Sequence, residues 1–537
     1  MRETYGREMH ADVVVIGGGL GGVAAAIAAL RAGRSVLLSE EYAWLGGQLT
    51  SQAVPPDEHS WVESFGVTAS YRALRDGIRD YYRRHYPLTG RARGTRDLNP
   101  GAGHVSRLCH EPRVAVAVIE SMLTPYRSTG LLRVLQPAKP VSATTDGDRV
   151  TSVTVTHDGA EIVLTGPYVL DATETGELLP MTGTEFVTGF ESQGETGEPS
   201  APASPSASNM QAFSVCFAID QVDGDHTIDR PASYARWRDH QPDFWGAPML
   251  SWQTPNPRTL ETSTRSFTPN PDDDPWLVSA DQRVNPGDGN LWTFRRIAAR
   301  RNFVDGFYPS DICLVNWPMI DYFEEPLIGA PAPAEVEQRA RELSMSVFYW
   351  LQTEAPRPDG GTGWRGLRLR GDVTGGADGL AMAPYIRESR RIRAEYTIAE
   401  QDLSLAVRGD KGAVSHADAV GVGMYRIDLH PSTGGDNYID VASCPFELPL
   451  GALIPRRTEN LLPAGKNIGT THITNGSHRL HPTEWNAGEV AGALAAFCLD
   501  RAVTPRAVRN TPALLADFQQ RLTADGVELR WPDVSGY

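Results

Sequence analysis

Three glycines close to the N-terminus, Gly17, Gly19 and Gly22, follow the spacing G-x-G-x-x-G. In such a turn the first glycine permits a tight bend, the second leaves room for a pyrophosphate, and the third lets the helix pack closely on the strand. Glu40 lies where a carboxylate can accept hydrogen bonds from ribose hydroxyls, and its charge would repel a 2′-phosphate. These residues predict a dinucleotide site for FAD or NAD rather than NADP.

The segments around these residues have the patterns of the elements that must position them. Val13–Ile16 is an all-apolar run, as a parallel strand buried on both faces requires. Residues 23–32 are rich in alanine and favour a helix, and Gly33 stands at the expected C-cap. A second apolar run at 36–38 leads to Glu40. Strand, glycine turn, helix, strand and acid form the full context of a dinucleotide-binding unit.

Length and charge limit the other possible functions. The 537 residues suggest about two to four domain-sized units, and the net charge of −16 argues against a nonspecific nucleic-acid binder. No segment approaches the roughly 18 apolar residues that cross a membrane, and the N-terminus lacks an apolar signal core. The five cysteines are far apart and no metal-binding motif occurs, so we expect no metal site. We expect a soluble, cytoplasmic protein.

Further elements follow along the chain. We expect helices at 61–86, 114–123, 334–353 and 484–499, a hairpin around the turn at 146–148, a strand at 168–173 that returns to the first sheet, and a strand with a glycine turn at 460–469. Residues 192–209 are rich in Ser, Pro and Gly, which predicts a long loop near a domain boundary. A glycine pair at 46–47 suits a loop that passes close to a flat ligand.

Four motifs together resemble the FAD-dependent oxidoreductase family. They are GGGLGG at 17–22, LGGQLT at 45–50, DATETGELLP at 171–180 and LLPAGKNIGTTHITNGSHRLHPTEWNAGEVAG at 461–492. This family belongs to the glutathione-reductase-like flavoprotein superfamily and is distantly related to the fumarate-reductase flavoproteins. The resemblance implies an α/β fold: a Rossmann-type FAD-binding domain, GR2-like with a three-layer ββα sandwich, plus a mixed α+β substrate domain.

The resemblance and the composition together predict a division of the chain. We expect the first part of the FAD-binding domain at 1–190, a substrate domain at 191–440, the returning part of the FAD-binding domain at 441–505, and a C-terminal helix and tail at 506–537.

The resemblance also implies which residues bind FAD. They are Gly17, Gly19 and Gly22 at the pyrophosphate, Glu40 at the adenosine ribose, Gly46, Gly47, Gln48 and Leu49 along the flavin, Asp171, Ala172 and Thr173 at the nucleotide half, Gly465, Lys466, Asn467 and Ile468 at the pyrophosphate and ribityl chain, and Glu484 and Asn486 on a helix whose N-terminus points at the flavin N1–C2=O edge. Lys466 either faces the flavin or is a solvated surface cation. Residues 42–45 contain no histidine, so we expect non-covalent FAD, with His59 and Cys109 as alternative attachment points.

A flavin dehydrogenation needs a base for the substrate's proton and groups that orient the substrate. Four of the thirteen histidines lie in suggestive places: His430, His472, His478 and His481. We expect His430 or His481 to be the base, and Arg479, with Arg426, to grip an anionic or hydroxylated substrate. Arg295, Arg296, Arg300 and Arg301 could form an anion site, but a charged helix face is the expectation.

The sequence thus predicts an FAD-dependent dehydrogenase or oxidase that moves a hydride from a small polar substrate to flavin N5, with oxygen, a quinone or a carrier as electron acceptor. One alternative is the reverse chemistry, reduction of an activated C=C bond, which Arg479 would suit. Another is a structural FAD in RNA modification, against which the net charge of −16 argues. No second G-x-G-x-x-G motif for NADPH occurs, and the oligomeric state stays open.

Overall fold

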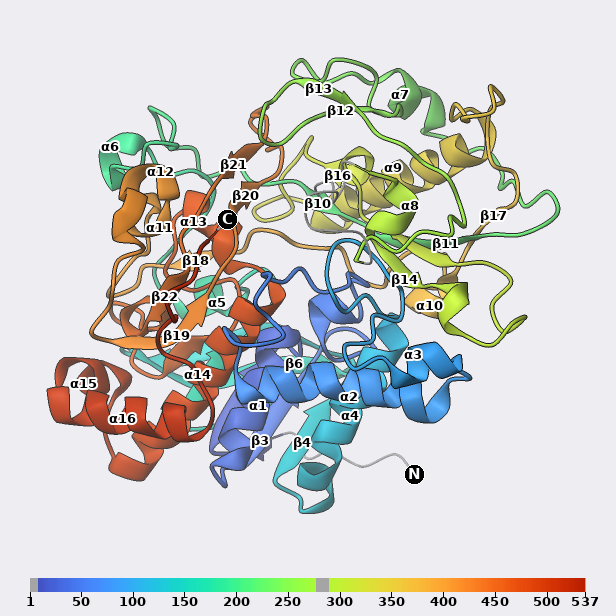
Figure 1. The fold of residues 1–537 in the computed structure, drawn as a ribbon. Coiled ribbons are helices and arrows are strands. Elements are labelled where there is room, and N and C mark those ends of the chain that lie inside the picture. Colours follow the sequence, from blue (N-terminus) through green and yellow to red (C-terminus); the bar gives the residue numbers. More distant parts are fainter. Residues whose placement is uncertain (1–7, 277–288, 537) are drawn as a thin grey trace.

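The computed structural model describes residues 8–276 and 289–536 (Figure 1). A five-stranded parallel sheet is built around the first apolar run, in the order β23 (Leu461–Pro463), β8 (Tyr168–Asp171), β2 (Val13–Ile16), β3 (Val36–Ser39) and β4 (Leu132–Leu135). Every residue of β2 is buried, because both faces of the sheet are covered. The C-terminal strand β23 therefore completes a sheet that the N-terminal part of the chain begins.

Helices cover one face of this sheet. α1 (Leu20–Arg31) follows the glycine turn and packs along α14 (His481–Arg501). The two helices touch through small residues: a Cβ on Gly488 would lie 2.0 Å from the carbonyl oxygen of Gly21. α4 (Pro112–Ser128) also contacts α1, on the way to β4. Figure 1 shows α14, coloured red, beside the blue N-terminal elements.

A second sheet covers the other face. It runs in the order β1 (Glu8–His10), β7 (Ala160–Thr165), β6 (Arg149–His157) and β5 (Ala138–Asp146). Strand residues alternate between faces. One apolar cluster accordingly joins the inward residues of both sheets: Val14, Ile16, Leu37 and Val169 from the parallel sheet, and Val153, Val155 and Leu164 from the other. The N-terminal half thus has three layers: helices, the parallel sheet, and a second sheet in which β5, β6 and β7 form an antiparallel meander and β1 pairs with β7 in parallel.

A different sheet lies in the middle third of the sequence. Its four strands pair antiparallel in the order β14 (Arg296–Ala298), β15 (Ile312–Val315), β11 (Phe217–Gln221) and β17 (Leu367–Leu369). The long helix α9 (Pro333–Thr353) packs nearby, and Ser344 on it donates to the carbonyl oxygen of Val215 at 2.7 Å. These green and yellow elements lie together, apart from the parallel sheet (Figure 1).

The remaining elements are mostly short. They are η1 (Gly47–Leu49), α2 (Ala69–His85), α3 (Gly90–Gly94), α5 (Leu178–Thr182), β9 (Phe186–Val187), α6 (Gln193–Thr196), β10 (Phe213–Ser214), α7 (Tyr234–Asp239), β12 (Gln253–Pro255), β13 (Thr262–Thr264), α8 (Leu291–Phe294), η3 (Arg300–Asn302), η4 (Pro318–Ile320), β16 (Asp321–Tyr322), α10 (Gly371–Thr374), β18 (Arg391–Ile392), α11 (Glu400–Leu403), α12 (Leu405–Arg408), η5 (Gly409–Lys411), β19 (Ala419–Gly423), β20 (Ile427–Leu429), β21 (Ile439–Val441), β22 (Phe446–Pro449), η6 (Leu450–Leu453), α13 (His472–His478), α15 (Pro505–Asn510) and α16 (Pro512–Ala524). Over the described ranges, no helix is both long and apolar enough to cross a bilayer.

The predicted elements are confirmed with shifted ends. The helix expected at 61–86 begins only at Ala69, where Thr68 caps it by accepting a hydrogen bond from the Tyr71 amide at 3.2 Å. The helix expected from Glu484 begins three residues earlier, at His481, because Pro482 suits a first turn. The predicted loop at 192–209 contains the short helix α6, which a Ser192–Glu195 capping box stabilises.

Candidate functional site

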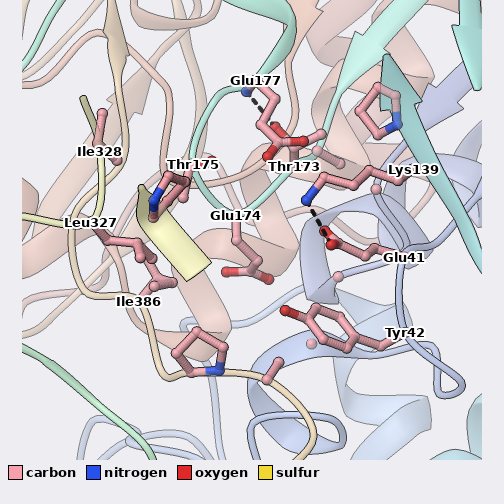
Figure 2. Close-up of a pocket in the computed structure, with 18 of the residues that line it drawn as sticks. Glu41, Tyr42, Lys139, Thr173, Glu174, Thr175, Glu177, Leu327, Ile328 and Ile386 are labelled. Atoms are coloured by element: carbon pink, nitrogen blue, oxygen red, sulfur yellow. Dashed lines mark hydrogen bonds and ion pairs between the residues drawn. The ribbon is translucent and has the colours of Figure 1, made fainter. Parts of the chain in front are cut away.

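A cavity of about 600 Å³ opens beside the glycine turn, at the carboxyl ends of the parallel strands. Gly17, Gly19, Glu40, Gly47, Ala172 and Thr173, all predicted cofactor residues, line it. Figure 2 shows the side chain of Glu174 pointing into the cavity, with Tyr42 on one side and Leu327 and Ile386 on another. Ligands of open α/β sheets bind at this end of the strands, so the cavity lies where the sequence predicts the dinucleotide.

The glycine turn needs glycine for the predicted reasons. Gly17 has a φ of +97°, and a Cβ there would lie 2.3 Å from the carbonyl oxygen of Ala172. A Cβ on Gly22 would lie 2.0 Å from the carbonyl oxygen of Gly17. The turn therefore brings the N-terminus of α1, with its free N–H groups and positive dipole end, to the cavity. The Glu174 carboxylate lies against this turn, since a Cβ on Gly19 or on Gly47 would be 2.8 Å from Glu174 Oε1.

Glu40 lies just beyond the end of β3, with both carboxylate oxygens facing backbone amides. Oε2 accepts from Gly18 N at 2.7 Å and Oε1 from Tyr42 N at 2.8 Å. Burial raises the pKa of Glu40 to about 8, although these two hydrogen bonds act against the rise. The carboxyl lines the cavity with acceptor capacity to spare, which suits a ribose.

The glycine pair Gly46 and Gly47 forms a tight turn before η1. Gly46 has a φ of +109° and Gly47 a φ of +47°, so neither position suits a side chain. Gln48 reaches inward and donates to the carbonyl oxygen of Arg479 at 3.0 Å and to Glu484. Leu49 is buried below the turn. The pair thus connects the glycine turn of α1 to the start of α14.

Lys466 is buried, with 3% of its surface exposed, so the interpretation of a solvated surface cation is wrong. Its ammonium is paired with Glu174 and lies 3.6 Å from Glu484 Oε2. Burial alone would lower the pKa of Lys466, but the two carboxylates outweigh it and the net shift is upward. A fixed positive charge therefore lies between the two glycine turns and α14.

The remaining predicted cofactor residues lie around these turns. Asp171 ends β8 and accepts from the backbone and hydroxyl of Thr173 at 3.1 and 2.7 Å, which holds the turn that closes on Gly17. Asn467 donates to the carbonyl oxygen of Asp171 at 2.9 Å, between Gly465 and Ile468 in the turn after β23. Asn486 is turned elsewhere, because its amide donates to Val422 O at 3.3 Å.

Several buried polar atoms near the first cavity have no hydrogen-bond partner, and they indicate whether FAD fits there. Within the described ranges, Gln48 Oε1, Glu174 Oε1, Asn467 Oδ1 and both amide atoms of Gln52 make no hydrogen bond although they are buried. Such atoms are costly unless a ligand or water satisfies them. They lie along the glycine turns, the predicted path of pyrophosphate, ribityl chain and flavin. Apart from Gln52 Nε2, which is a donor, these atoms are acceptors, and they suit the ribityl hydroxyls and the flavin N3–H. Together with the glycine turn and the N-terminus of α1, they fit FAD.

A second cavity, of about 330 Å³, lies between the start of α14 and the middle sheet. Its lining includes Asp57, Arg295, Asn316, Arg426, Asp428, His430 and Tyr438. Asp57 also connects it to the cofactor side, since its backbone amide donates to His481 Nδ1 at 3.1 Å. Two predicted substrate-handling residues, His430 and Arg426, therefore line the same cavity.

His430 is held by a buried acid that the sequence did not reveal. Its Nδ1 lies 2.6 Å from Asp321 Oδ2, and Asp321 is fully buried. Asp321 also accepts from Ser214 Oγ at 2.7 Å and lies 2.9 Å from the Arg387 guanidinium. Burial raises the pKa of Asp321, but Arg387 and His430 outweigh it and bring the pKa to about 2. The acid is an anion at neutral pH and fixes the imidazole.

The other three histidines lie among structural partners and line neither cavity. His472 pairs with Glu388 at 2.8 Å. His478 bonds to Thr474 O at 2.9 Å, and burial lowers its pKa to about 4. His481, the other candidate base, receives the Asp57 amide in the first turn of α14, and burial lowers its pKa well below the usual value.

Arg479 lines neither cavity but contacts residues near both. Its carbonyl oxygen accepts from Gln48 on the cofactor side. Its guanidinium donates to Asp428 Oδ2 at 3.0 Å and to the Tyr385 hydroxyl at 3.2 Å. Arg426 pairs with Asp440 at the second cavity. Arg479 is thus 3% exposed and held by its own partners.

The expected charged helix face at 295–301 is wrong. Arg296 begins strand β14 and is fully buried, with Asp311 3.0 Å away and the carbonyl oxygens of Gly101 and Ala102 around it. Arg295 points into the second cavity. Sequence reasoning also missed Asp321, Asn316 and Tyr438. The one available signal was Asp321, an acid inside the apolar run at 319–323.

The family model described as FAD dependent oxidoreductase matches residues 12–522. No curated protein matches the chain. Among solved structures, the chain is similar to Mycobacterium smegmatis Sdh1 in complex with UQ1 (14% identity, TM-score 0.23, 31% of this chain and 34% of that one). It is similar to L-proline dehydrogenase from P. horikoshii (16% identity, TM-score 0.18, 35% and 25%) and OxyS anhydrotetracycline hydroxylase from Streptomyces rimosus (17% identity, TM-score 0.22, 41% and 39%).

The chain spans only a quarter to about two fifths of the length of these three structures, and at TM-scores of 0.18 to 0.23 the likenesses support no functional conclusion. The family model, in contrast, covers nearly the whole chain, including both glycine turns and α14. The chain belongs to the FAD-dependent oxidoreductase family, and it is an oxidoreductase with FAD as its cofactor.

Proposed function

We propose that this oxidoreductase dehydrogenates a small polar substrate that carries a C–OH, C–NH or CH–CH unit, by hydride transfer to flavin N5. The observation that carries the proposal is His430, which lines the second cavity with its Nδ1 bound to buried Asp321. That contact leaves Nε2 as the nitrogen for a substrate, with Asp428 Oδ2 3.8 Å away. Burial and the nearby Arg387 lower the pKa of His430, although Asp321 opposes the shift, so the ring is neutral and basic at pH 7.

Each residue then has a defined task. His430 takes the acidic proton of the substrate at Nε2, and Asp321 stabilises the imidazolium that results. Arg387 keeps Asp321 ionised through a 2.9 Å contact. Bound FAD supplies the acceptor for the hydride, that is, for the hydrogen and the electron pair of the broken C–H bond. We propose oxygen, a quinone or a carrier as the final acceptor of the two electrons.

On the cofactor side, we propose that the predicted residues hold FAD without a covalent bond. The cradle at Gly17, Gly19 and Gly47 supports a pyrophosphate site. We place Lys466, which is paired with Glu174 and lies 3.6 Å from Glu484 Oε2, beside it. The two alternative attachment points line neither cavity. His59 lies 3.1 Å from Gly66 O, and burial raises the pKa of Cys109 to about 12.

We also propose the GR2-like form of the FAD-binding domain, because the helix, parallel-sheet and meander layers match the expected ββα sandwich. The division into 1–190, 191–440, 441–505 and 506–537 stays our proposal. It is supported by β23, which joins the first sheet, and by the separate sheet of the middle region. We place the protein in the cytoplasm as part of the same proposal.

The reverse reaction, reduction of an activated C=C bond, is the second candidate. It requires a proton donor beside the substrate, and four arginines line the second cavity: Arg258, Arg265, Arg295 and Arg426. The buried couple of His430 and Asp321 favours the oxidation, because it builds a neutral base. A structural FAD in RNA modification is disfavoured by the net charge of −16.

Replacing the proposed base tests the function. The FAD-loaded protein is mixed anaerobically with a panel of sugars, amino acids and hydroxy acids, and the loss of flavin absorbance is followed in time. We expect His430→Gln to slow this reduction by about 10²- to 10⁴-fold with its FAD content unchanged. His478→Gln is the control, since His478 is buried away from both cavities. Reduction of His430→Gln at the wild-type rate would contradict the proposal.

A further inference from the structure

We propose that the second cavity recognises the carboxylate of its substrate through Arg295 and Asn316, so that the substrate is a small organic acid. This inference rests on the proposed dehydrogenation and names the substrate class for it. Three observations carry it: an unpartnered amide donor, a loosely held buried guanidinium, and acids that already have other partners.

Asn316 lines the cavity and has a buried amide donor without a partner. It follows strand β15 and is 5% exposed. Its Oδ1 accepts from Arg387 Nη2 at 3.4 Å, which orients the amide, and its Nδ2 has no partner within the described ranges. The same Arg387 holds Asp321, and Asp321 holds His430. Asn316 is therefore tied to the proposed base through two shared side chains, and it lines the same cavity as His430.

Arg295 brings a positive charge to the same space. Its side chain is 11% exposed and stands over the ring of Phe294, 4.6 Å from the ring centroid. Its polar contacts are long: 3.4 Å to the carbonyl oxygen of Asn316 and 3.5 Å to Asp57 Oδ1. Burial raises the pKa of Asp57, although Arg295 and Arg479 oppose the rise, which weakens this counter-charge. A buried guanidinium without a close anion is costly, so a bound anion would stabilise it.

The other acids of the cavity are already neutralised by arginines. Glu58 binds Arg75 at 2.8 Å. Asp428 binds Arg479 at 3.0 Å, and Asp440 is paired with Arg426. Their negative charge is therefore not available as a counter-charge for Arg295. It also repels an incoming anion only weakly. The net field at Arg295 and Asn316 favours a carboxylate.

Tyr438 adds a third donor. It is 4% exposed, its hydroxyl has no partner within the described ranges, and its ring centroid lies 5.4 Å from that of His430. A guanidinium can bind a carboxylate with two parallel hydrogen bonds, and a carboxylate accepts about four in all. Arg295, Asn316 and Tyr438 supply that set. With about 330 Å³ available, the ligand is a small acid with its oxidisable C–H bond near the carboxylate.

The test compares two probes of nearly the same shape, benzoate and benzamide, by calorimetric titration of the FAD-loaded protein. We expect benzoate to bind at least about tenfold more tightly, because only benzoate offers a charge to the guanidinium. Arg295→Met and Asn316→Asp should each weaken benzoate at least about tenfold and leave benzamide little changed. Arg300→Met, on a neighbouring arginine outside the cavity, should bind both probes as wild type does.

Equal binding of the two probes by the wild-type protein, or unchanged benzoate binding in both cavity variants, would overturn the inference. Since the wild-type comparison needs no variant, the test holds even if Arg295→Met fails to fold. The two proposals fail differently. If neutral alcohols or amines reduce the flavin through His430 while benzoate does not bind, only the carboxylate site is wrong. If benzoate binding depends on Arg295 but His430→Gln reduces as fast as wild type, only the proposed chemistry is wrong.

Discussion

At the scale of single residues, the second cavity is organised by one buried anion. Asp321 has three partners, His430, Ser214 and Arg387, and no solvent contact. Its charge holds the imidazole in one orientation and stabilises the protonated ring once a proton arrives. Asp321 acts through His430 and is a positioning residue for the proposed reaction.

We predict that Asp321→Asn slows substrate-driven flavin reduction by about 10²-fold or more, because the imidazolium loses its counter-charge. The pH profile should move as well. The pKa of His430 is already lowered by burial, and loss of the anion lowers it further, so the acid limb of the rate shifts to lower pH. Stopped-flow reduction at several pH values measures both effects.

Ser214→Ala is the matched control, since it removes a 2.7 Å hydrogen bond to Asp321 but keeps the carboxylate. It should change the rate much less and leave the acid limb in place. An Asp321→Asn protein with a slower rate but the wild-type pH profile would show that Asp321 only supports the fold.

At the scale of elements, the cofactor cradle depends on how closely α14 approaches α1. Gly488 and Gly492 face the backbone of α1, where a Cβ would lie 2.0 Å from Gly21 O and 2.1 Å from Ala25 O. This approach brings the first turn of α14, with Gln48 and Lys466 beside it, to the glycine turn. Small residues in the helix interface therefore position groups that are more than 460 residues apart in sequence, such as Gly21 and Glu484.

We predict that Gly488→Ala destabilises the protein by about 1–3 kcal/mol and weakens FAD binding, because the added methyl group pushes the helices apart. Helix propensity alone would make this change stabilising. Gly90→Ala in α3 is the control, since a Cβ there meets nothing within 4 Å. Denaturant unfolding and FAD titration measure the two effects, and a Gly488→Ala protein as stable as Gly90→Ala would refute the packing argument.

At the scale of the whole molecule, burial keeps several histidines neutral. Burial lowers the pKa of His59, His110 and His478 to about 4 each. In the unfolded chain these rings take up protons near pH 6.5. Between pH 6.5 and 4 the unfolded state thus binds more protons, so the folded state loses stability as the pH falls through this window.

We predict that replacing one of these histidines makes the loss of folding stability at acidic pH less steep. His478→Gln should lower the melting temperature at pH 7, because the ring packs on Phe446 with centroids 4.3 Å apart. Its melting temperature should then fall less steeply from pH 6.5 to 4.5 than that of the wild type. The exposed His85→Gln variant should keep the wild-type slope. Equal slopes in all three proteins would contradict the prediction.

The sequence by itself determined the cofactor half of this protein. Gly17, Gly19, Gly22 and Glu40 are close in the chain, and local rules for strand, turn and helix link their spacing to a pyrophosphate cradle. The return of β23 and α14 to this unit was also predictable, from the motif at 461–492. Helix ends shifted by a few residues, because capping groups such as Thr68 decide them locally.

Only the tertiary structure decided the second cavity. Asp321 contacts His430, which lies 109 residues later in the chain, and Arg387, which lies 66 residues later. No periodic pattern in the sequence predicts these contacts. The four chosen histidines looked alike in sequence, and burial beside different partners separated His430 from the others. Arg295 looked like part of a charged helix, yet the chain enters strand β14 there and turns the guanidinium inward. Long-range packing sets charge, pKa and access, and these are properties of the folded surroundings rather than of spacing along the chain.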